Sequence, residues 1–333
     1  MQEINNMNLI LNKFKIKACC INHQLNNNYS FYDLKLNSST KVKDIQNIGD
    51  EISLALQAPC KPLIKVLHAQ GVVRLEFISS KIKKNNLLNL MLSSVRPEGE
   101  LMCLLGTKVD GDPLWMDLSK NPHMIVSGTT GSGKSILLHN IIANILYFNN
   151  ACLFLIDPKN VEFLGYQNLF ENIKVYSDYA SCLRTIEFLL ELMEIRYNLL
   201  RNGPISNLEP QILIIDEFAD FIMQDKGNEL YSALCRLAQK CRAANIYIIL
   251  ATQRPSANII NGSIKANFPA RISCRVTSNT ESKIILDSGG AENLFGSGDA
   301  LVKDSLRNIE RFQIAYTDSK ETFNFLKKND CRK

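Results

Sequence analysis

The distribution of apolar and polar residues divides the chain into a short N-terminal part and a longer C-terminal part. Residues 1–28 are rich in asparagine and show little periodicity, so we expect a flexible arm. After it, apolar residues recur at helical spacing over residues 45–56. Residues 62–69 and 72–79 then alternate like the two strands of a hairpin. These patterns predict a small α+β domain with its linker over residues 29–105.

Residues 106–333 combine short apolar runs with longer helical patterns. Four near-continuous apolar runs have the length of strands, and they cover residues 123–127, 152–157, 212–216 and 246–251. Runs of this kind are typical of a parallel sheet that is buried on both faces. The clearest helical pattern spans residues 183–200, with apolar residues at steps of three and four. Strands that alternate with helices predict a doubly wound α/β domain with a mostly parallel sheet.

The composition is that of an ordinary globular protein. The chain of 333 residues is 46% hydrophobic, and its net charge of +5 is only a mild preference for anionic partners. The 10 cysteines include no C-x₂-C pair, so we expect reduced thiols rather than a disulfide framework or a zinc site. No apolar segment reaches the length that crosses a bilayer, and the N-terminus lacks the apolar region of a signal peptide. We therefore expect a cytoplasmic protein that reaches the inner face of a membrane only through a partner.

A phosphate-binding signature follows the first apolar run of the large domain. The residues that fit G-x-x-x-x-G-K-[ST] are Gly128, Thr129, Thr130, Gly131, Ser132, Gly133, Lys134 and Ser135. The signature lies between a predicted strand and a predicted helix, where backbone amides and the helix N-terminus can surround phosphate oxygens. The pattern predicts a P-loop that binds ATP. Lys134 should reach the β- and γ-phosphates, and the Ser135 hydroxyl should bind Mg²⁺.

Two acidic residues follow a later apolar run and complete the predicted site. Asp216 is expected to hold the Mg²⁺ through water, and Glu217 is expected to act as the general base on the attacking water. The run 152–157 falls between the two motifs in the chain, which predicts an extra strand between them in the sheet, as in RecA-like motors. Gln253 ends the next run and either senses the γ-phosphate or occupies an ordinary turn.

Seven blocks of sequence, in the same order over residues 100–305, resemble the FtsK/SpoIIIE DNA translocases. The blocks are residues 122–127, 156–159 together with Glu162, 193–197, 216–220, 251–255, 264–267 and 289–292. Residues 29–80 resemble, more weakly, the small domain that precedes the motor in that family. The resemblance implies a RecA-like ATPase that assembles as a hexameric ring and moves double-stranded DNA, for chromosome or plasmid segregation. It also implies a possible partner protein at the membrane or division site.

The resemblance also implies roles for several basic residues. Arg242 matches the arginine that reaches the ATP of a neighbouring subunit; the alternatives are a solvated helix face or Arg236 in its place. Arg254 and Lys283 match positions that contact DNA phosphates in the pore, and Lys265 is a further cation nearby. At Asn279 many family members carry a basic residue instead.

Departures from the family leave other functions open. The connection over residues 201–210 is shorter than in many relatives, and we expect neither a C-terminal winged-helix module nor N-terminal membrane spans. One alternative is a coupling or secretion ATPase that moves DNA–protein or protein substrates. Another is a nucleotide-gated binding protein that does not hydrolyse ATP, although Lys134, Asp216 and Glu217 are all present.

Overall fold

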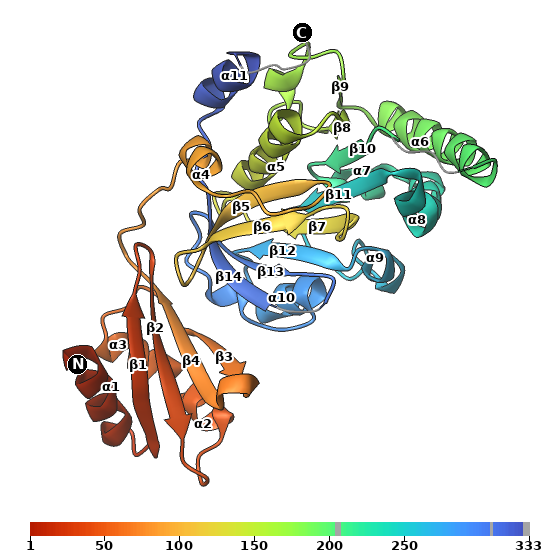
Figure 1. Cartoon of the computed structure of the whole chain (residues 1–333). Coiled ribbons are helices and arrows are strands. Elements are labelled where there is room, and N and C mark those ends of the chain that lie inside the picture. Colours follow the sequence, from red (N-terminus) through yellow and green to blue (C-terminus); the bar gives the residue numbers. More distant parts are fainter. Residues whose placement is uncertain (204–207, 307–308, 329–333) are drawn as a thin grey trace.

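The chain folds into a small N-terminal domain and a large C-terminal domain (Figure 1). The structure, a computed structural model, describes residues 1–203, 208–306 and 309–328. The connection over residues 201–210 therefore lies partly outside the described residues, and the last five residues lie wholly outside them. Within the described ranges, the strands form a four-stranded sheet and a ten-stranded sheet. No helix in these ranges is both long enough and apolar enough to cross a membrane.

The small domain is an antiparallel sheet with helices on one face. Its strand order is β1-β2-β4-β3. Its elements are α1 (Gln2–Lys13), β1 (Ala18–Leu25), β2 (Tyr29–Leu36), α2 (Val42–Asn47), α3 (Gly49–Ala55), β3 (Leu63–Leu67), the 3₁₀ helix η1 (His68–Gln70) and β4 (Val72–Ile78). The predicted hairpin is confirmed as the pair β3 and β4. The single helix expected over residues 45–56 is instead two short helices, α2 and α3.

The predicted flexible arm is wrong, because residues 2–25 form α1 and β1. Met7, Ile10 and Leu11 lie on one side of α1 and are buried against the sheet, whereas most asparagines of the helix are exposed. The side chain of Asn8 also accepts a hydrogen bond from the backbone of Cys20 at 2.7 Å, which ties the helix to β1. Three apolar residues at helical spacing were therefore enough to anchor an otherwise polar segment.

The large sheet has a parallel half and an antiparallel half. Its strands are, in sheet order, β6 (Pro113–Asp117), β5 (Met102–Lys108), β14 (Ile309–Ile314), β13 (Asp299–Lys303), β12 (Ala270–Cys274), β7 (His123–Ser127), β11 (Ile246–Thr252), β10 (Gln211–Ile215), β8 (Cys152–Ile156) and β9 (Ile173–Tyr176). From β12 to β9 neighbouring strands are parallel, and from β6 to β12 they are antiparallel. The four apolar runs are thus confirmed as the buried strands β7, β8, β10 and β11.

One strand separates the two motif-bearing strands, but it is not the one expected from the chain order. β11 lies between β7 and β10, and β8 lies on the far side of β10. The prediction that residues 152–157 fill this position is therefore wrong. The chain passes from β10 through two helices before it returns to the gap beside β7, so the strand order in the sheet differs from that in the sequence.

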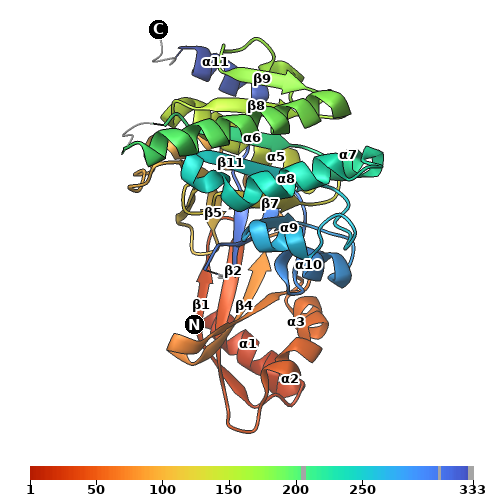
Figure 2. The same ribbon diagram turned by 90° about the vertical axis from the view of Figure 1, so that its right-hand side faces the viewer.

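Helices cover both faces of the large sheet (Figures 1 and 2). The helices that pack into one core are α4 (Leu87–Ser93), α5 (Lys134–Phe148) and α11 (Ser319–Lys328). Those of the opposite core are α6 (Tyr179–Arg201), α7 (Phe218–Gln224), α8 (Glu229–Lys240), α9 (Gly262–Asn267) and α10 (Asn279–Leu286). The remaining 3₁₀ helices are η2 (Leu164–Tyr166), η3 (Cys241–Ala244) and η4 (Ala291–Asn293). The P-loop therefore lies at the start of a helix that is packed on the sheet.

The boundary expected at residue 106 falls too late in the chain. β5 begins at Met102 and belongs to the large sheet, and α4 packs with β5 and α5 in one apolar cluster. Residues 87–105 therefore belong to the large domain. Of the predicted linker, only the segment between β4 and α4 joins the two domains.

The two domains meet through a buried polar contact. The Tyr29 hydroxyl of β2 donates a hydrogen bond to Asp299 of β13 at 2.9 Å. Arg311 of β14 binds both carboxylate oxygens of Asp299, at 2.9 and 2.7 Å, and donates to the backbone carbonyl of Glu76 in β4 at 2.8 Å. Burial raises the pKa of the Glu76 carboxyl above its ordinary value. This contact joins the small sheet directly to the antiparallel half of the large one.

Candidate nucleotide-binding site

The phosphate-binding signature forms a tight loop between β7 and α5. Gly133 has a φ of +113°, and a Cβ atom there would lie 2.8 Å from the Cα atom of Gly298. A side chain would therefore strain the backbone and displace the neighbouring segment. Gly298 donates its amide to the carbonyl of Ser132 at 2.8 Å, so a segment from far along the chain supports the loop. The local sequence thus places backbone amides at the N-terminus of α5, as phosphate binding requires.

Lys134 and Asp216 form a buried pair beside the loop. The Lys134 ammonium donates to the Asp216 side chain at 2.5 Å and to its backbone carbonyl at 2.9 Å. Asp216 directly follows β10, whose apolar residues are all buried in the sheet. The predicted carboxylate is therefore next to the predicted lysine, as the proposed chemistry needs. A phosphate group entering the loop would compete with Asp216 for this ammonium group.

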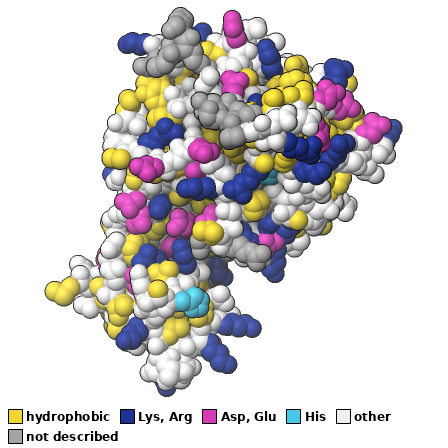
Figure 3. All heavy atoms as spheres, turned by 45° about the vertical axis from the view of Figure 1, so that its right-hand side comes forward, with side chains coloured by type: hydrophobic (Ala, Val, Ile, Leu, Met, Phe, Trp, Pro, Cys, Tyr) yellow, Lys and Arg dark blue, Asp and Glu magenta, His cyan; other side chains and the backbone are white. Residues whose placement is uncertain are grey.

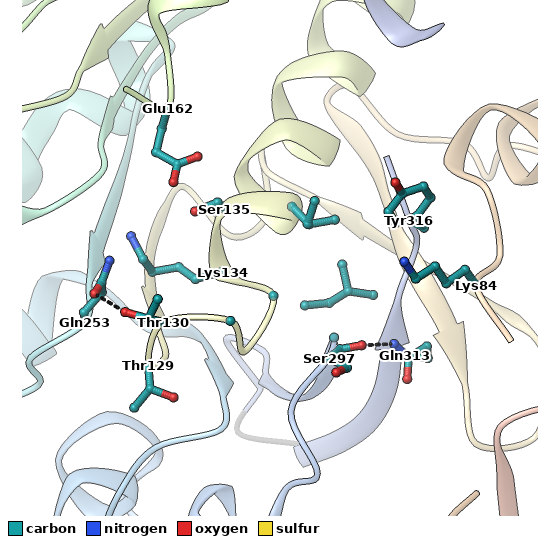
Figure 4. Close-up of a pocket in the computed structure, with 15 residues that line it drawn as sticks. Lys84, Thr129, Thr130, Lys134, Ser135, Glu162, Gln253, Ser297, Gln313 and Tyr316 are labelled. Carbon is teal, nitrogen blue, oxygen red and sulfur yellow. Dashed lines mark hydrogen bonds between the residues drawn. The ribbon is translucent and has the colours of Figure 1, made fainter. Parts of the chain in front are cut away.

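Glu217 is connected to the P-loop through the end of β11. Its two carboxylate oxygens accept hydrogen bonds from the Thr252 hydroxyl at 2.7 Å and from the Gln253 amide at 3.0 Å. The Gln253 side chain in turn accepts a hydrogen bond from the Thr130 hydroxyl at 3.0 Å (Figure 4). Glu217 is buried and is not among the residues that line the cavity described below. Gln253 therefore bridges the acidic residue and the phosphate loop.

A cavity of about 350 Å³ opens over the P-loop. This volume lies within the range of small-molecule sites, roughly 300–1,000 Å³. The loop residues, Ile136 and Ile314 line it, and Figure 4 shows Gln253 at one side and Gln313, Tyr316 and Lys84 at the other. The Lys84 ammonium lies 4.4 Å from the centre of the Tyr316 ring, a cation–π contact. The cavity therefore offers a phosphate-binding side and an apolar, aromatic side.

Residues on the aromatic side were not found by reasoning from the sequence. Gln313 lies in β14, Tyr316 lies just after this strand, and Lys84 lies in the segment between the domains. Neither segment carries a motif. The end of β14 is held near the P-loop by the hydrogen bond from the Ile314 amide to Gly298, and backbone hydrogen bonds of Tyr316 with Asn85 and Leu87 bring the segment of Lys84 beside it.

Of the three acidic residues near the loop, Glu162 is the one whose side chain lines the cavity, whereas Asp216 and Glu217 are not among the lining residues. The neighbouring His139 imidazole, and then the Ser135 hydroxyl, hold the pKa of Glu162 below its ordinary value, although burial raises it. The sequence pattern had marked Glu162 without giving it a role.

The donor groups at the loop fit ATP with Mg²⁺. Ser135 and Lys134 line the cavity, and Asp216 is paired with Lys134. Among the described residues, no group of three or more His, Cys, Asp or Glu side chains could hold a metal ion. Mg²⁺ commonly takes only one or two protein ligands and completes its shell with substrate phosphates and water. A site with one hydroxyl and one carboxylate therefore suits a cation that arrives with its nucleotide.

Comparison with known proteins identifies the family. The sequence model of the FtsK/SpoIIIE family matches residues 93–212 and 205–257. The chain belongs to the FtsK/SpoIIIE family. It is 34% identical over 301 residues to the DNA translocase FtsK of Chlamydia pneumoniae, and 31% identical over 317 residues to the DNA translocase SftA of Bacillus subtilis. These matches cover 81% and 89% of this chain but only 37% and 33% of the relatives, so the chain spans about a third of their length.

A solved structure supports the fold of this FtsK/SpoIIIE chain over its whole length. The structure of the pCW3 conjugation coupling protein TcpA with ATPγS has a TM-score of 0.70 to this chain at 23% sequence identity. The match covers 100% of both chains, so it includes the small domain as well as the large one. The predicted RecA-like P-loop ATPase fold is therefore confirmed.

The FtsK/SpoIIIE resemblance predicts that Arg242 acts on a neighbouring subunit, and the structure places Arg242 away from its own cavity. It lies on η3, after α8, and its side chain is exposed. It is not among the residues that line the cavity of the same chain. Arg236, the fallback, is exposed on α8 and lies 3.8 Å from Glu194. Of the two, only Arg242 forms no ion pair with an acidic side chain within the described residues.

The three predicted DNA-binding residues differ in their surroundings. Arg254 is exposed directly after Gln253, and Lys283 is exposed on α10. Lys265 of α9 is instead bound to Asp287 at 2.5 Å, in a cluster that also contains Arg271 and Lys303. On the face that Figure 3 shows, basic side chains of the large domain are interspersed with acidic ones. Arg254 and Lys283 are therefore available for a ligand, whereas Lys265 already serves the packing of α9.

Proposed function

We propose that this chain is an ATP-hydrolysing motor that moves double-stranded DNA through a ring of identical subunits. The observation that carries the proposal is the continuous contact path from Lys134 and Asp216 at the P-loop to Glu217, Gln253 and Thr130. A binding protein needs only the loop, whereas hydrolysis also needs an acidic residue coupled to it, and Glu217 is coupled to the loop through Gln253. The names of the curated relatives, DNA translocases, supply the choice of substrate.

Each residue of the site has a proposed part in hydrolysis. Lys134 leaves Asp216 and binds the β- and γ-phosphates, and Asp216 and Ser135 are then free to hold Mg²⁺. The cation, when bound, neutralises charge that builds up on the transferred phosphoryl group. Glu217 takes the proton of the attacking water. Gln253 reports the state of the phosphate to Glu217, because its side chain contacts the P-loop and its amide contacts the carboxylate.

Arg242 is proposed to complete the site of the next subunit in the ring. Its exposed position outside its own cavity suits a residue that acts across a subunit interface. An arginine that binds the transferred phosphoryl group typically contributes about 10³–10⁵-fold to turnover. A hexamer is the assembly that the family resemblance implies. Cytoplasmic location and recruitment to the membrane by a partner stay predictions.

Contacts with DNA are proposed to involve phosphates rather than bases. Arg254 and Lys283 are exposed, and Arg254 directly follows the residue that bridges Glu217 and the P-loop. Because the two residues are adjacent, a change at Gln253 when the nucleotide changes can alter the contact of Arg254 with DNA. A motor that contacts only the backbone can move over any sequence. Lys265 is a weaker candidate because its ammonium group is bound to Asp287.

The experiment that tests this function is the ATPase rate of the purified chain with and without long duplex DNA, together with the mass of the particle. We expect duplex DNA to stimulate hydrolysis and the active species to be an oligomer. Lys134→Ala is the control and should abolish both nucleotide binding and turnover. ATPase activity that duplex DNA does not change would contradict DNA translocation and favour a coupling or secretion ATPase. Absence of hydrolysis with Mg²⁺ and DNA would favour a nucleotide-gated binding protein.

A further inference from the structure

The loop that follows β8 is held in one shape by a single buried carboxylate. Asp157 is fully buried, and its side chain accepts hydrogen bonds from the backbone amides of Lys159, Val161, Glu162 and Phe163. The four donor–acceptor distances lie between 2.7 and 3.2 Å. A carboxylate that accepts this many amides fixes the path of the backbone around it. The loop is therefore a rigid support for whatever side chains it carries.

Glu162 is the side chain that this loop presents to the nucleotide cavity. Its carboxylate points toward Ser135 and Lys134 in Figure 4, and about a third of the side chain is exposed. Behind it, the His139 Nε2 atom of α5 lies 3.7 Å from the Glu162 Oε2 atom. The other ring nitrogen of His139 lies 2.9 Å from the Tyr166 hydroxyl, which fixes the imidazole. Glu162 is thus oriented both by its own loop and by α5.

The shape of the loop does not depend on the Glu162 side chain. Asp157 provides the internal hydrogen bonds of the loop, and Phe163 anchors it in the core. Lys134 is paired with Asp216 here and, in the proposed function, binds the β- and γ-phosphates once nucleotide enters, so its charge is used in both states. A carboxylate directed at a polyphosphate is repelled by it unless a cation lies between them. The position of Glu162 is therefore favourable only when a cation accompanies the nucleotide.

We propose that Glu162 is a further residue of the nucleotide site, which binds the water shell of the divalent cation that accompanies ATP beside Ser135. This inference rests on the nucleotide site of the proposed function and adds a residue to it. Residues that hydrogen-bond the ligands or waters of a metal typically change its affinity by 10–100-fold when they are substituted. Glu162 and Asp216 would then hold the cation from the segments that follow two neighbouring strands of the sheet, β8 and β10.

The test measures the affinity for a fluorescent, non-hydrolysable ATP analogue as Mg²⁺ is titrated, and again in EDTA. In Glu162→Gln we expect the Mg²⁺ concentration for half-maximal effect to rise about 10-fold. Affinity in EDTA should stay the same or increase, because a repulsive charge has been removed. Glu171→Gln is the matched control, since Glu171 is exposed and does not line the cavity. Glu162→Asp, which keeps the charge, should recover part of the Mg²⁺ effect.

Two results would overturn the inference. One is the same Mg²⁺ dependence in Glu162→Gln and Glu171→Gln. The other is an equal loss of affinity in EDTA and in Mg²⁺, which would make Glu162 a structural residue of the loop. The proposed function can fail independently of this inference. If the wild-type chain binds the analogue with Mg²⁺ dependence but duplex DNA does not stimulate its ATP hydrolysis, the DNA motor is rejected and the role of Glu162 remains. If it binds no nucleotide, both are rejected.

Discussion

The acidic residues of the site are held in place by hydrogen bonds from protein groups. Asp216 is bound to Lys134, and Glu217 is bound to Thr252 and to the amide of Gln253. Each carboxylate is thus held in one orientation before any ligand enters. Such preorganisation is favourable for catalysis because little rearrangement is left for the reaction itself.

Exchanging the Glu217 carboxylate for an amide should separate binding from turnover. In Glu217→Gln the hydrogen bond from Thr252 can persist, so we expect the nucleotide affinity to remain close to that of the wild type. Turnover should fall by about 10²–10⁴-fold, the usual contribution of a general base. Equilibrium binding and steady-state ATPase assays on the same preparation measure the two effects. A variant that hydrolyses ATP at the wild-type rate would exclude Glu217 as the base.

Residues could be assigned from the sequence where a contiguous motif defines the chemistry. The P-loop, Asp216 and Gln253 were predicted, and the structure brings all of them together. Tyr316 could not be predicted, because its place at the cavity depends on the pairing of β14 with β5. Glu162 carried a usable signal, a strand that ends in a buried aspartate with an acidic residue five positions later.

At the level of elements, an ionic cluster around Asp287 holds α9 and α10 to the sheet. Asp287 follows α10 and binds Lys265 of α9, Arg271 of β12 and Lys303 of β13. Although burial raises it, hydrogen bonds from these three residues hold the pKa of Asp287 well below its ordinary value. Elements that are distant in the chain are therefore joined at one carboxylate.

Removing the Asp287 charge should destabilise the protein. In Asp287→Asn the buried Arg271 and Lys303 lose their anionic partner, and we expect a loss of about 1–2 kcal/mol, reduced by solvent because Asp287 is 46% exposed. Urea denaturation measures the change, with Glu187→Gln on the exposed face of α6 as control. The folded-state pKa is depressed, so the stabilisation is present above the unfolded pKa of about 4 and is lost as the pH falls below it. Equal stability of both variants at neutral pH would contradict this role.

Element types were predictable from the sequence, but their order in the sheet was not. The apolar runs identified β7, β8, β10 and β11 because strands buried on both faces leave a continuous signal. The place of β11 next to β7 is set by crossovers that leave no local pattern. The helix α1 was missed for another reason: a few buried apolar residues were outnumbered by asparagine.

On the scale of the whole molecule, a buried ion pair and its hydrogen bonds join the small domain to the large one. Asp299 and Arg311 are almost completely buried, and Tyr29 and the backbone of Glu76 complete their hydrogen bonds. A buried ion pair of this kind contributes little by itself, but loss of one partner leaves an uncompensated charge.

Substitutions in this contact should have graded effects. Arg311→Leu strands Asp299 in the interior, and we expect a loss of about 3–5 kcal/mol in the free energy of unfolding. Tyr29→Phe removes one hydrogen bond to a charged group and should cost about 1.5–3 kcal/mol. Chemical denaturation measures both, with the exposed Arg201→Leu as the reference for loss of an arginine. If Arg311→Leu were no less stable than Arg201→Leu, the contact would not hold the domains together.

The close approach of Gly298 to Gly133 limits how small a working fragment of this protein can be. The phosphate-binding signature ends at Ser135, yet the segment that packs against it and supports it lies some 160 positions later in the chain. A truncated polypeptide that stops after β12 would keep the signature and both acidic residues but lose the backing of its phosphate loop. Because the Ile314 amide of β14 donates a hydrogen bond to Gly298, any minimal fragment designed to capture nucleotide must extend through β14.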